Sequence, residues 1–174
     1  MAYLKHPLVP LFCSLLICAC ATAQLTPEQA ALRATTPTMA AAQPNRHQGK
    51  SVEWGGLLIA THNRQNHTLI EILAYPLRSN GRPNLGDQSL GRFLAIRAGY
   101  LEPLEFTAGR QLTVIGPITG TRQGRVGEGD YIYPTIEAGK LQLWPREAPG
   151  RTPRLRFGIG VGSGGGGFGA GIGF

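Results

Sequence analysis

The chain has 174 residues, 42% hydrophobic and 16% charged, which is the size of one ordinary domain with tails. No apolar run reaches the about 18 residues that a membrane-spanning helix requires, so the sequence argues against an integral helical membrane protein. The formal net charge of +7 overstates the basic character of the domain, because ten basic and eight acidic residues lie between Lys50 and Trp144. Nucleic-acid-binding domains usually carry a basic stripe on their own surface, so nucleic acid is not an expected partner.

Residues 1–19 have the pattern of a bacterial lipoprotein signal peptide. A short basic head precedes an apolar stretch of signal-peptide length, Leu8 to Cys18. Ile17-Cys18-Ala19-Cys20 then follows the lipobox pattern, with a branched aliphatic residue three positions before a cysteine and a small residue directly before it. The thiol is the group that is diacylated, and the small side chain fits the peptidase at the cleaved bond. We predict lipidation at Cys20; the alternative is an ordinary secretory peptide cut after Ala21 or Ala23.

Cleavage before Cys20 has consequences for chemistry and for location. Cys20 becomes the single cysteine of the mature chain, so thiols form no disulfide, zinc site or iron–sulfur site, and no cysteine nucleophile remains. We expect no cofactor. The residue after the cysteine is Ala21 and not an aspartate, which in the Gram-negative sorting rule favours the outer membrane. The predicted location is therefore the outer membrane, with outer-membrane lipid as the partner of the acyl anchor.

Residues 20–48 are expected to form a disordered tether that holds the domain away from the bilayer. The segment is rich in Ala, Thr, Gln and Pro and has few large apolar residues. Pro27 to Arg33 has the composition of two helical turns with Thr26 as the N-cap. Its apolar surface is too small for us to expect strong docking.

The stretch from Ser51 to Leu77 predicts a β-hairpin. Trp54, Gly56 and Leu58 lie on one face of an extended first strand, and Thr68 to Tyr75 resumes with β-branched and aromatic residues after a polar break. Apolar residues occupy both faces in places. This is typical of a strand in a small closed barrel.

Further strands follow this hairpin. Gly91 to Ala98 reads as a third strand and Arg110 to Thr119 as a fourth, in which Pro117 predicts an edge or a bulge. A glycine-containing loop is expected over residues 122–130. Tyr131 to Glu137 and Lys140 to Trp144, split by Ala138-Gly139, complete a fifth, interrupted strand. Residues 49–147 are therefore predicted to form an all-β domain, a small five-stranded Greek-key barrel of the OB type.

Residues 148–174 are expected to form a disordered tail, because the glycine-rich end cannot form a packed core. Three arginines, Arg151, Arg154 and Arg156, follow Arg146 near its start. A basic tail is suited to phosphate at a membrane surface, which makes lipopolysaccharide a candidate partner, beside an envelope protein. The alternative is a solvated linker.

Few residues of the domain suggest catalysis. Glu71 lies within the second strand, and a buried carboxylate can be catalytic, but more often it pairs with an arginine such as Arg92 or Arg97. No second acid has an obvious claim to the two-carboxylate chemistry of glycosidases. His62 and His67 bracket the first turn, yet two histidines without a third ligand make a weak metal site. We expect neither an enzyme nor a metal site.

Five aromatic residues offer two interpretations. On strands they form either a stacking platform for single-stranded nucleic acid or core and girdle residues, of which the second is commoner. They are Trp54, Phe93, Tyr131, Tyr133 and Trp144. We assign Trp54, Glu71, Arg92 and Trp144 structural roles.

Several blocks in order resemble the Slp (starvation-inducible) outer-membrane lipoproteins of Gram-negative bacteria. Together they cover roughly residues 49–147. They are Trp54-Gly55-Gly56, Thr68-Leu69-Ile70-Glu71-Ile72 with Tyr75-Pro76-Leu77, Gly91-Arg92-Phe93-Leu94-Ala95, Gly99-Tyr100-Leu101-Glu102-Pro103, Gly109 to Gly116, Tyr131-Ile132-Tyr133-Pro134 and Leu141-Gln142-Leu143-Trp144.

This resemblance implies an outer-membrane lipoprotein with a small β domain and no established catalytic residues. It implies acylation at Cys20 and a role in envelope maintenance or stress response. A periplasmic binding module for lipid, glycan or a protein partner is the alternative. The chain departs from the family in its longer Ala/Thr/Pro segment and in its glycine-rich end, which replaces an aromatic-bearing tail.

Overall fold

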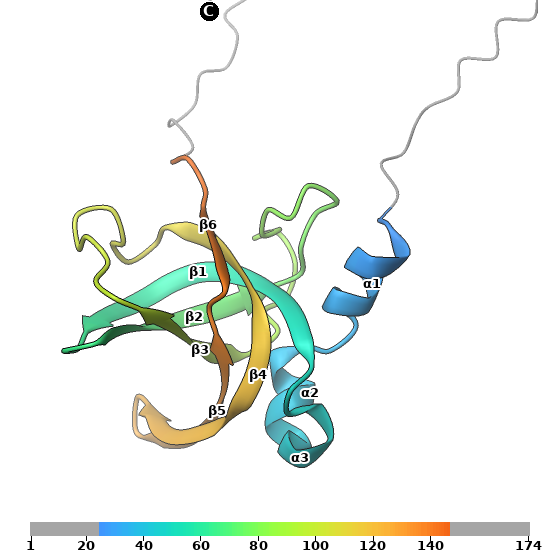
Figure 1. Cartoon of the computed structure of the whole chain (residues 1–174), viewed down its shortest axis with the longest axis horizontal. Helices are drawn as coiled ribbons and strands as arrows, with labels where there is room; N and C mark the ends of the chain where they lie inside the picture. The colour runs from blue at the N-terminus through green and yellow to red at the C-terminus, as the bar shows by residue number, and fades with distance from the viewer. Residues whose placement is uncertain (1–24, 147–174) are drawn as a thin grey trace, which may run out of the picture.

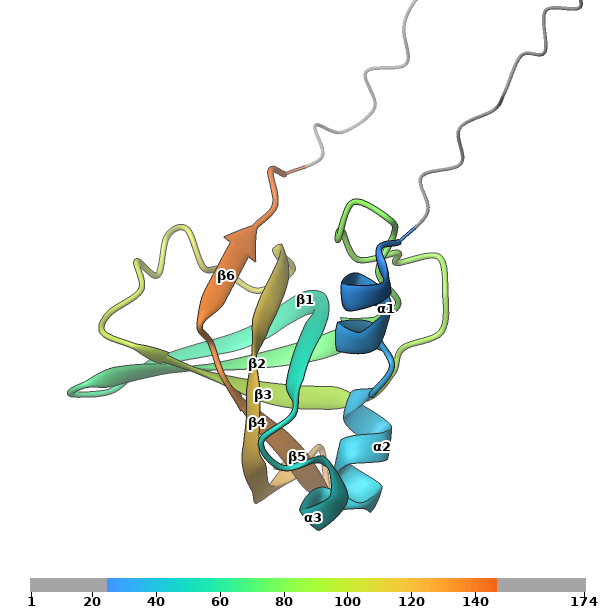
Figure 2. The ribbon, with the colours of Figure 1, turned by 45° about the vertical axis from the view of Figure 1, so that its right-hand side comes forward.

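The computed structural model describes residues 25–146 (Figures 1 and 2). Within this range three short helices precede six strands. The helices are α1 (Pro27–Arg33), α2 (Pro37–Ala42) and α3 (Pro44–His47). The strands are β1 (Ser51–Asn63), β2 (His67–Tyr75), β3 (Arg92–Ala98), β4 (Gln111–Val126), β5 (Gly129–Glu137) and β6 (Lys140–Leu143). The predicted all-β class is confirmed. Cys20 and the predicted tail over residues 148–174 lie outside the described residues.

The strand pairings form a ring. The order is β1-β2-β3-β5-β4, and β4 also pairs with β1. β3 and β5 run parallel, whereas the other pairs are antiparallel. β5 and β6 follow one another as partners of β4, with Ala138 and Gly139 between them. This arrangement is the interrupted last strand that the sequence predicts.

The core lies inside this ring and draws on both halves of the chain. Trp54 and Leu58 of β1 meet apolar side chains from β2, β3, β4 and β5, with no more than 4% of any of them exposed. The others include Ile70, Ile72, Phe93, Leu112, Val114, Ile118 and Ile136. Leu69, Leu94 and Tyr133 form a second, smaller cluster. The alternation of the predicted strands therefore identifies the buried face correctly.

Two glycines allow neighbouring strands to approach closely. A Cβ added to Gly56 would lie 1.9 Å from the main-chain oxygen of Leu73, and one added to Gly116 would lie 1.8 Å from that of Glu137. No side chain fits at such a distance, so the absence of a Cβ is required here. These glycines, within the first and fourth strands, are therefore needed for the close packing of the neighbouring main chains.

The expected loop over residues 122–130 is wrong, because β4 continues through it. Arg122 pairs with Tyr133 and Val126 with Gly129, so the segment is one arm of a hairpin that turns at Gly127, where φ is +58°. Most side chains of this arm are exposed, so the buried alternation that identifies a strand in sequence is missing. The predicted irregularity near Pro117 is present as a register shift between Ile118 and Gly120.

Residues 25–48 do not form the expected tether. Thr26 caps α1 through a capping box, Thr36 caps α2, and each of the three helices has proline in its first turn. The helices lie against one side of the strands (Figures 1 and 2). Polar contacts fasten α1 and the connection after it to β1, and α2 buries the small residues Pro37 and Ala40, of which Ala40 joins the core. The segment docks in this way without the large apolar surface whose absence suggested a tether. Among the described helices, none has the length and apolarity needed to cross a membrane.

Candidate functional site

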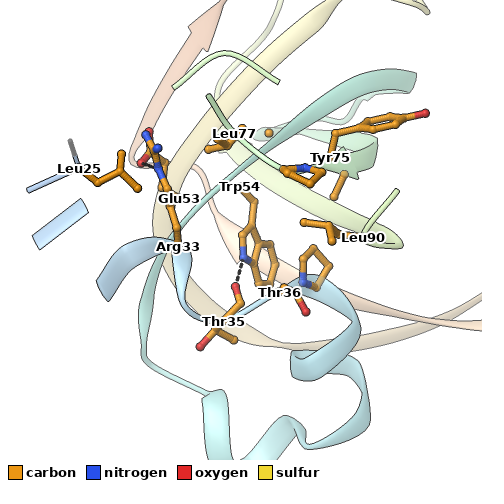
Figure 3. Close-up of a pocket in the computed structure, with 13 residues that line it drawn as sticks. Leu25, Arg33, Thr35, Thr36, Glu53, Trp54, Tyr75, Leu77 and Leu90 are labelled. Atoms are coloured by element: carbon orange, nitrogen blue, oxygen red, sulfur yellow. Dashed lines mark hydrogen bonds and ion pairs between the residues drawn. The ribbon is translucent and has the colours of Figure 1, made fainter. Parts of the chain in front are cut away.

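An apolar cavity of about 250 Å³ lies between the N-terminal segment and the β1–β2 hairpin (Figure 3). Leu25 and the α1–α2 connection form one wall, and residues of β1 and of the chain after β2 form the other. The apolar lining includes Leu25, Pro37, Trp54, Ala74, Pro76, Leu77 and Leu90. Two elements far apart in sequence therefore line one open pocket.

Trp54 is fixed at the base of this cavity. Its indole Nε1–H donates to the main-chain oxygen of Thr35 at 2.6 Å, and its ring meets that of Phe93 edge-on at 5.1 Å between centroids. Only 4% of Trp54 is exposed. A buried indole N–H requires a partner, and here the partner is the chain that connects α1 with α2.

An ion pair forms the polar wall of the cavity. Arg33 Nε donates to Glu53 Oε2 at 2.6 Å, and the two side chains are 11% and 10% exposed. Arg33 Nη1 also donates to the main-chain oxygen of Arg78 at 3.0 Å. Removing one partner of such a pair leaves the other charge desolvated, which is costly. Neither residue is identified by the sequence, which contains no pattern that brings α1 to β1.

The cavity suits an apolar group better than a polar substrate. Its charged side chains already satisfy one another, and the remaining lining is mostly aliphatic or aromatic. A volume of about 250 Å³ lies below the about 300–1,000 Å³ of common small-molecule pockets. The space is sufficient for part of an aliphatic chain or one ring.

Glu71 and Arg92 form a second polar cluster, with Tyr133, away from this cavity. Arg92 Nη1 donates to Glu71 Oε1 at 2.7 Å, and the hydroxyl of Tyr133 donates to the same oxygen at 3.1 Å. Burial and the adjacent Glu71 carboxylate raise the pKa of Tyr133. The hydrogen bond from Arg92 to Glu71 raises the pKa of the guanidinium despite partial burial. The Glu71 carboxylate of β2 thus accepts from one residue of β3 and one of β5, and so connects the three strands.

Trp144 follows β6 and holds three parts of the chain together. Its indole Nε1–H donates to Thr113 Oγ1 at 3.0 Å, and the guanidinium of Arg82 lies 5.9 Å from the ring centroid. Arg110 Nη2 donates to the main-chain oxygen of Trp144 at 2.9 Å. The residue thus connects β4 and the chain between β2 and β3 with the last described residues.

The five aromatic residues do not form a single platform. Trp54 and Phe93 pack in the main core, whereas Tyr131 and Tyr133 stack edge-on at 4.7 Å in the other cluster. Trp144 lies beside Arg82. The interpretation as core and girdle residues fits this distribution better than a stacking surface does.

The two turn histidines are not paired across the hairpin. The register places His62 opposite Leu69, while His67 faces Ala98 of β3. Across residues 25–146 no group of three or more His, Cys, Asp or Glu side chains is arranged to hold a metal ion.

His47, at the end of α3, is not predicted from the sequence. It is buried, its Nδ1 lies 3.4 Å from Thr35 Oγ1, and burial together with Lys50 and Arg46 lowers its pKa. Only its position beside the basic residues Arg46 and Lys50 is visible in the sequence.

These features define a class of protein: a small all-β domain in which an N-terminal helical segment closes an apolar cavity over a fixed tryptophan. The model of the outer membrane lipoprotein Slp family matches residues 17–157. The chain therefore belongs to this family, as its sequence blocks indicated.

Two curated relatives illustrate the match. The chain is 37% identical over 101 residues to the uncharacterized lipoprotein YeaY of Escherichia coli strain K12, covering 58% of this chain and 52% of that protein. It is 30% identical over 102 residues to the outer membrane protein Slp of the same strain, covering 59% and 54%. The chain spans about half the length of the curated relatives it matches. Family membership identifies an envelope lipoprotein and points to the bacterial outer membrane.

A solved structure with a similar course is the N-terminal domain of the PriB protein from Thermoanaerobacter tencongensis. The TM-score is 0.32 at 13% identity, over 55% of this chain and 97% of that one. A likeness at this level carries no argument about function.

Proposed function

We propose that this protein is an outer-membrane lipoprotein anchored by acylated Cys20, and that its β domain maintains the envelope by binding and not by catalysis. The observation that carries the proposal is the lipobox ending at Cys20 within a chain of the Slp family. In this proposal the acyl anchor holds the domain at the outer membrane, and the β domain binds its partner there.

Acylation at Cys20 provides sufficient energy for stable attachment. Each buried CH₂ contributes about 0.8 kcal/mol, and two or more acyl chains give anchoring that one chain does not.

The polar clusters support a role without turnover. Glu71 is bound by Arg92 and Tyr133, and Glu53 by Arg33, so the half-buried and the buried carboxylate are both engaged in ion pairs. A general acid or base needs a proton-transfer partner within reach of substrate. Both carboxylates are better placed to fasten strands and helices together.

The test of the anchor is Cys20→Ser, with Cys18→Ser as the matched control in the same peptide. Membrane fractionation should find the Cys20→Ser protein in the soluble fraction and the control in the outer membrane. Mass spectrometry of the N-terminal peptide should show acyl chains on Cys20 in the control. Membrane attachment that survives Cys20→Ser would overturn the proposal.

A second candidate function is a binding module, and the cavity over Trp54 favours it. Its apolar lining fits an aliphatic group such as part of a lipid chain. Leu90→Trp should fill the cavity and weaken the binding of a fluorescent fatty acid, whereas Ile132→Trp on exposed β5 should not. Equal binding by both variants and the wild type would contradict a ligand in this cavity.

A further inference from the structure

We propose that one end of the domain rests directly on the lipid surface of the membrane. This end, the anchor end, is defined by Leu25, the loop between β2 and β3 (residues 76–91) and Trp144 to Arg146. The inference rests on acylation at Cys20. It adds an interaction surface and an orientation to the proposed function.

The chain between the anchor and the first described residue is short. Five residues extend from Cys20 to Leu25, and a fully extended chain covers at most about 3.3–3.6 Å per residue, so Leu25 lies within about 18 Å of the acylated cysteine. A free tether up to Gln48 would extend about 100 Å on the same measure. The docked helices therefore keep the domain close to the bilayer.

The helical segment that follows Leu25 is fastened to β1 and to the loop after β2. Arg33 binds Glu53 of β1 at 2.6 Å and the main-chain oxygen of Arg78 at 3.0 Å. The next connection is held by the hydrogen bond from Trp54 to Thr35. A pull on Leu25 is therefore transmitted to β1 and to the loop after β2.

The parts of the anchor end are joined to one another. Arg78 accepts from Arg33, and Arg82 Nη2 donates to the main-chain oxygen of Pro145 at 3.3 Å. In Figures 1 and 2 the start of α1, the loop between β2 and β3 and the end of β6 all lie at the upper end of the domain. The β4–β5 hairpin lies at the opposite end.

The composition of the anchor end fits a phospholipid surface. Leu25 and Leu85 are exposed large hydrophobic residues, at 39% and 38%. The same segments carry the exposed arginines Arg78 and Arg146 and the exposed acid Asp87. Apolar side chains that enter the acyl boundary beside cations that meet lipid phosphates are the pattern of interfacial membrane contact.

Site-specific labelling of the full acylated protein tests the orientation. Ser79→Cys places an environment-sensitive fluorophore in the loop between β2 and β3, and Gln123→Cys places it on the β4 arm of the far hairpin; both positions are exposed. Cys20 does not react, because its sulfur carries the lipid. The proteins are reconstituted into phosphatidylethanolamine–phosphatidylglycerol vesicles with and without brominated acyl chains.

The fluorescence emission of the label at position 79 should shift to shorter wavelength. Brominated lipid should quench it several-fold more than it quenches the label at position 123. If the protein floats with vesicles but the two labels are quenched equally, or 123 more strongly, the proposed orientation is overturned and the anchor stands. If the protein does not float and its N-terminal peptide carries no acyl chain, the proposed function fails, and this inference with it.

Discussion

Trp54 of β1 donates its indole N–H to the main-chain oxygen of Thr35 at 2.6 Å, and this bond joins the helical segment to the sheet. The two residues lie on different elements, and the bond is buried. This contact and the Arg33–Glu53 ion pair hold the helical segment against β1, and the cavity lies between these two parts of the chain.

Trp54→Phe should loosen the helical segment while keeping an aromatic ring in the core. The loss of a buried hydrogen bond that leaves the Thr35 oxygen unpaired costs about 1–3 kcal/mol. Denaturant unfolding should show this loss, and limited proteolysis should cut residues 25–48 faster than in the wild type. Trp144→Phe, at a partly exposed indole, is the matched control and should leave these cleavage sites protected.

Gly56→Ala should destabilise the domain severely. The new Cβ would lie 1.9 Å from the Leu73 oxygen, so β1 and β2 have to separate, at a cost of more than about 3 kcal/mol. Gly86→Ala is the control, because its Cβ meets no atom closer than 3.8 Å. Similar thermal midpoints for the two variants would show that the strand pair adapts without cost.

Stability should fall at alkaline pH partly through Tyr133. Burial and Glu71 raise the pKa of this hydroxyl above its ordinary value of 10.0, so the native state holds the proton more tightly than the unfolded chain. Its contribution is complete below about pH 10 and is lost as the pH rises through the native pKa. Between about pH 8 and pH 11 the free energy of unfolding should therefore fall less in Tyr133→Phe than in the wild type.

Tyr100→Phe, which removes an exposed hydroxyl, is the matched control for this measurement. It should keep the alkaline loss of the wild type. An unchanged loss in Tyr133→Phe would show that other groups account for it.

Stability should also fall in mild acid through His47. Burial first, then the charges of Lys50 and Arg46, lower the pKa of this imidazole below its ordinary 6.5. The contribution is present above about pH 6.5 and is lost as the pH falls through the lower native pKa. The free energy of unfolding should drop less in His47→Gln than in the wild type between about pH 7.5 and pH 5. Lys50→Gln, which removes one repelling charge, should give an intermediate slope.

The strands were predictable where one face is buried and not where both are exposed. On β1 the apolar residues Trp54 and Leu58 are buried, and Leu58 lies between the less buried Leu57 and Ile59; the sequence places that strand correctly. The arm from Arg122 to Val126 is largely exposed on both faces, and its sequence predicts a loop. Burial generates the alternating pattern, so its absence hides the strand.

The candidate site was predictable only in its members on strands. Trp54 is a candidate because it is a tryptophan within a predicted strand. Of the two arginines predicted as partners of Glu71, the structure pairs Arg92 with it. Arg33 and Thr35 lie in a segment whose small apolar surface predicts a tether. They contact residues far away in sequence through individual hydrogen bonds and one ion pair, and such contacts produce no periodic pattern in a sequence.

The double pairing of β1 has a consequence for how the chain folds. Its partners on β2 follow within one short turn, but its partners on β4, from Gln111 to Pro117, lie 54 to 66 residues further along the chain. Contacts of such sequence separation form slowly. Until β4 arrives, the second edge of β1 stays open and available to other chains, so a chain emerging in sequence order depends on protection of this edge during that interval.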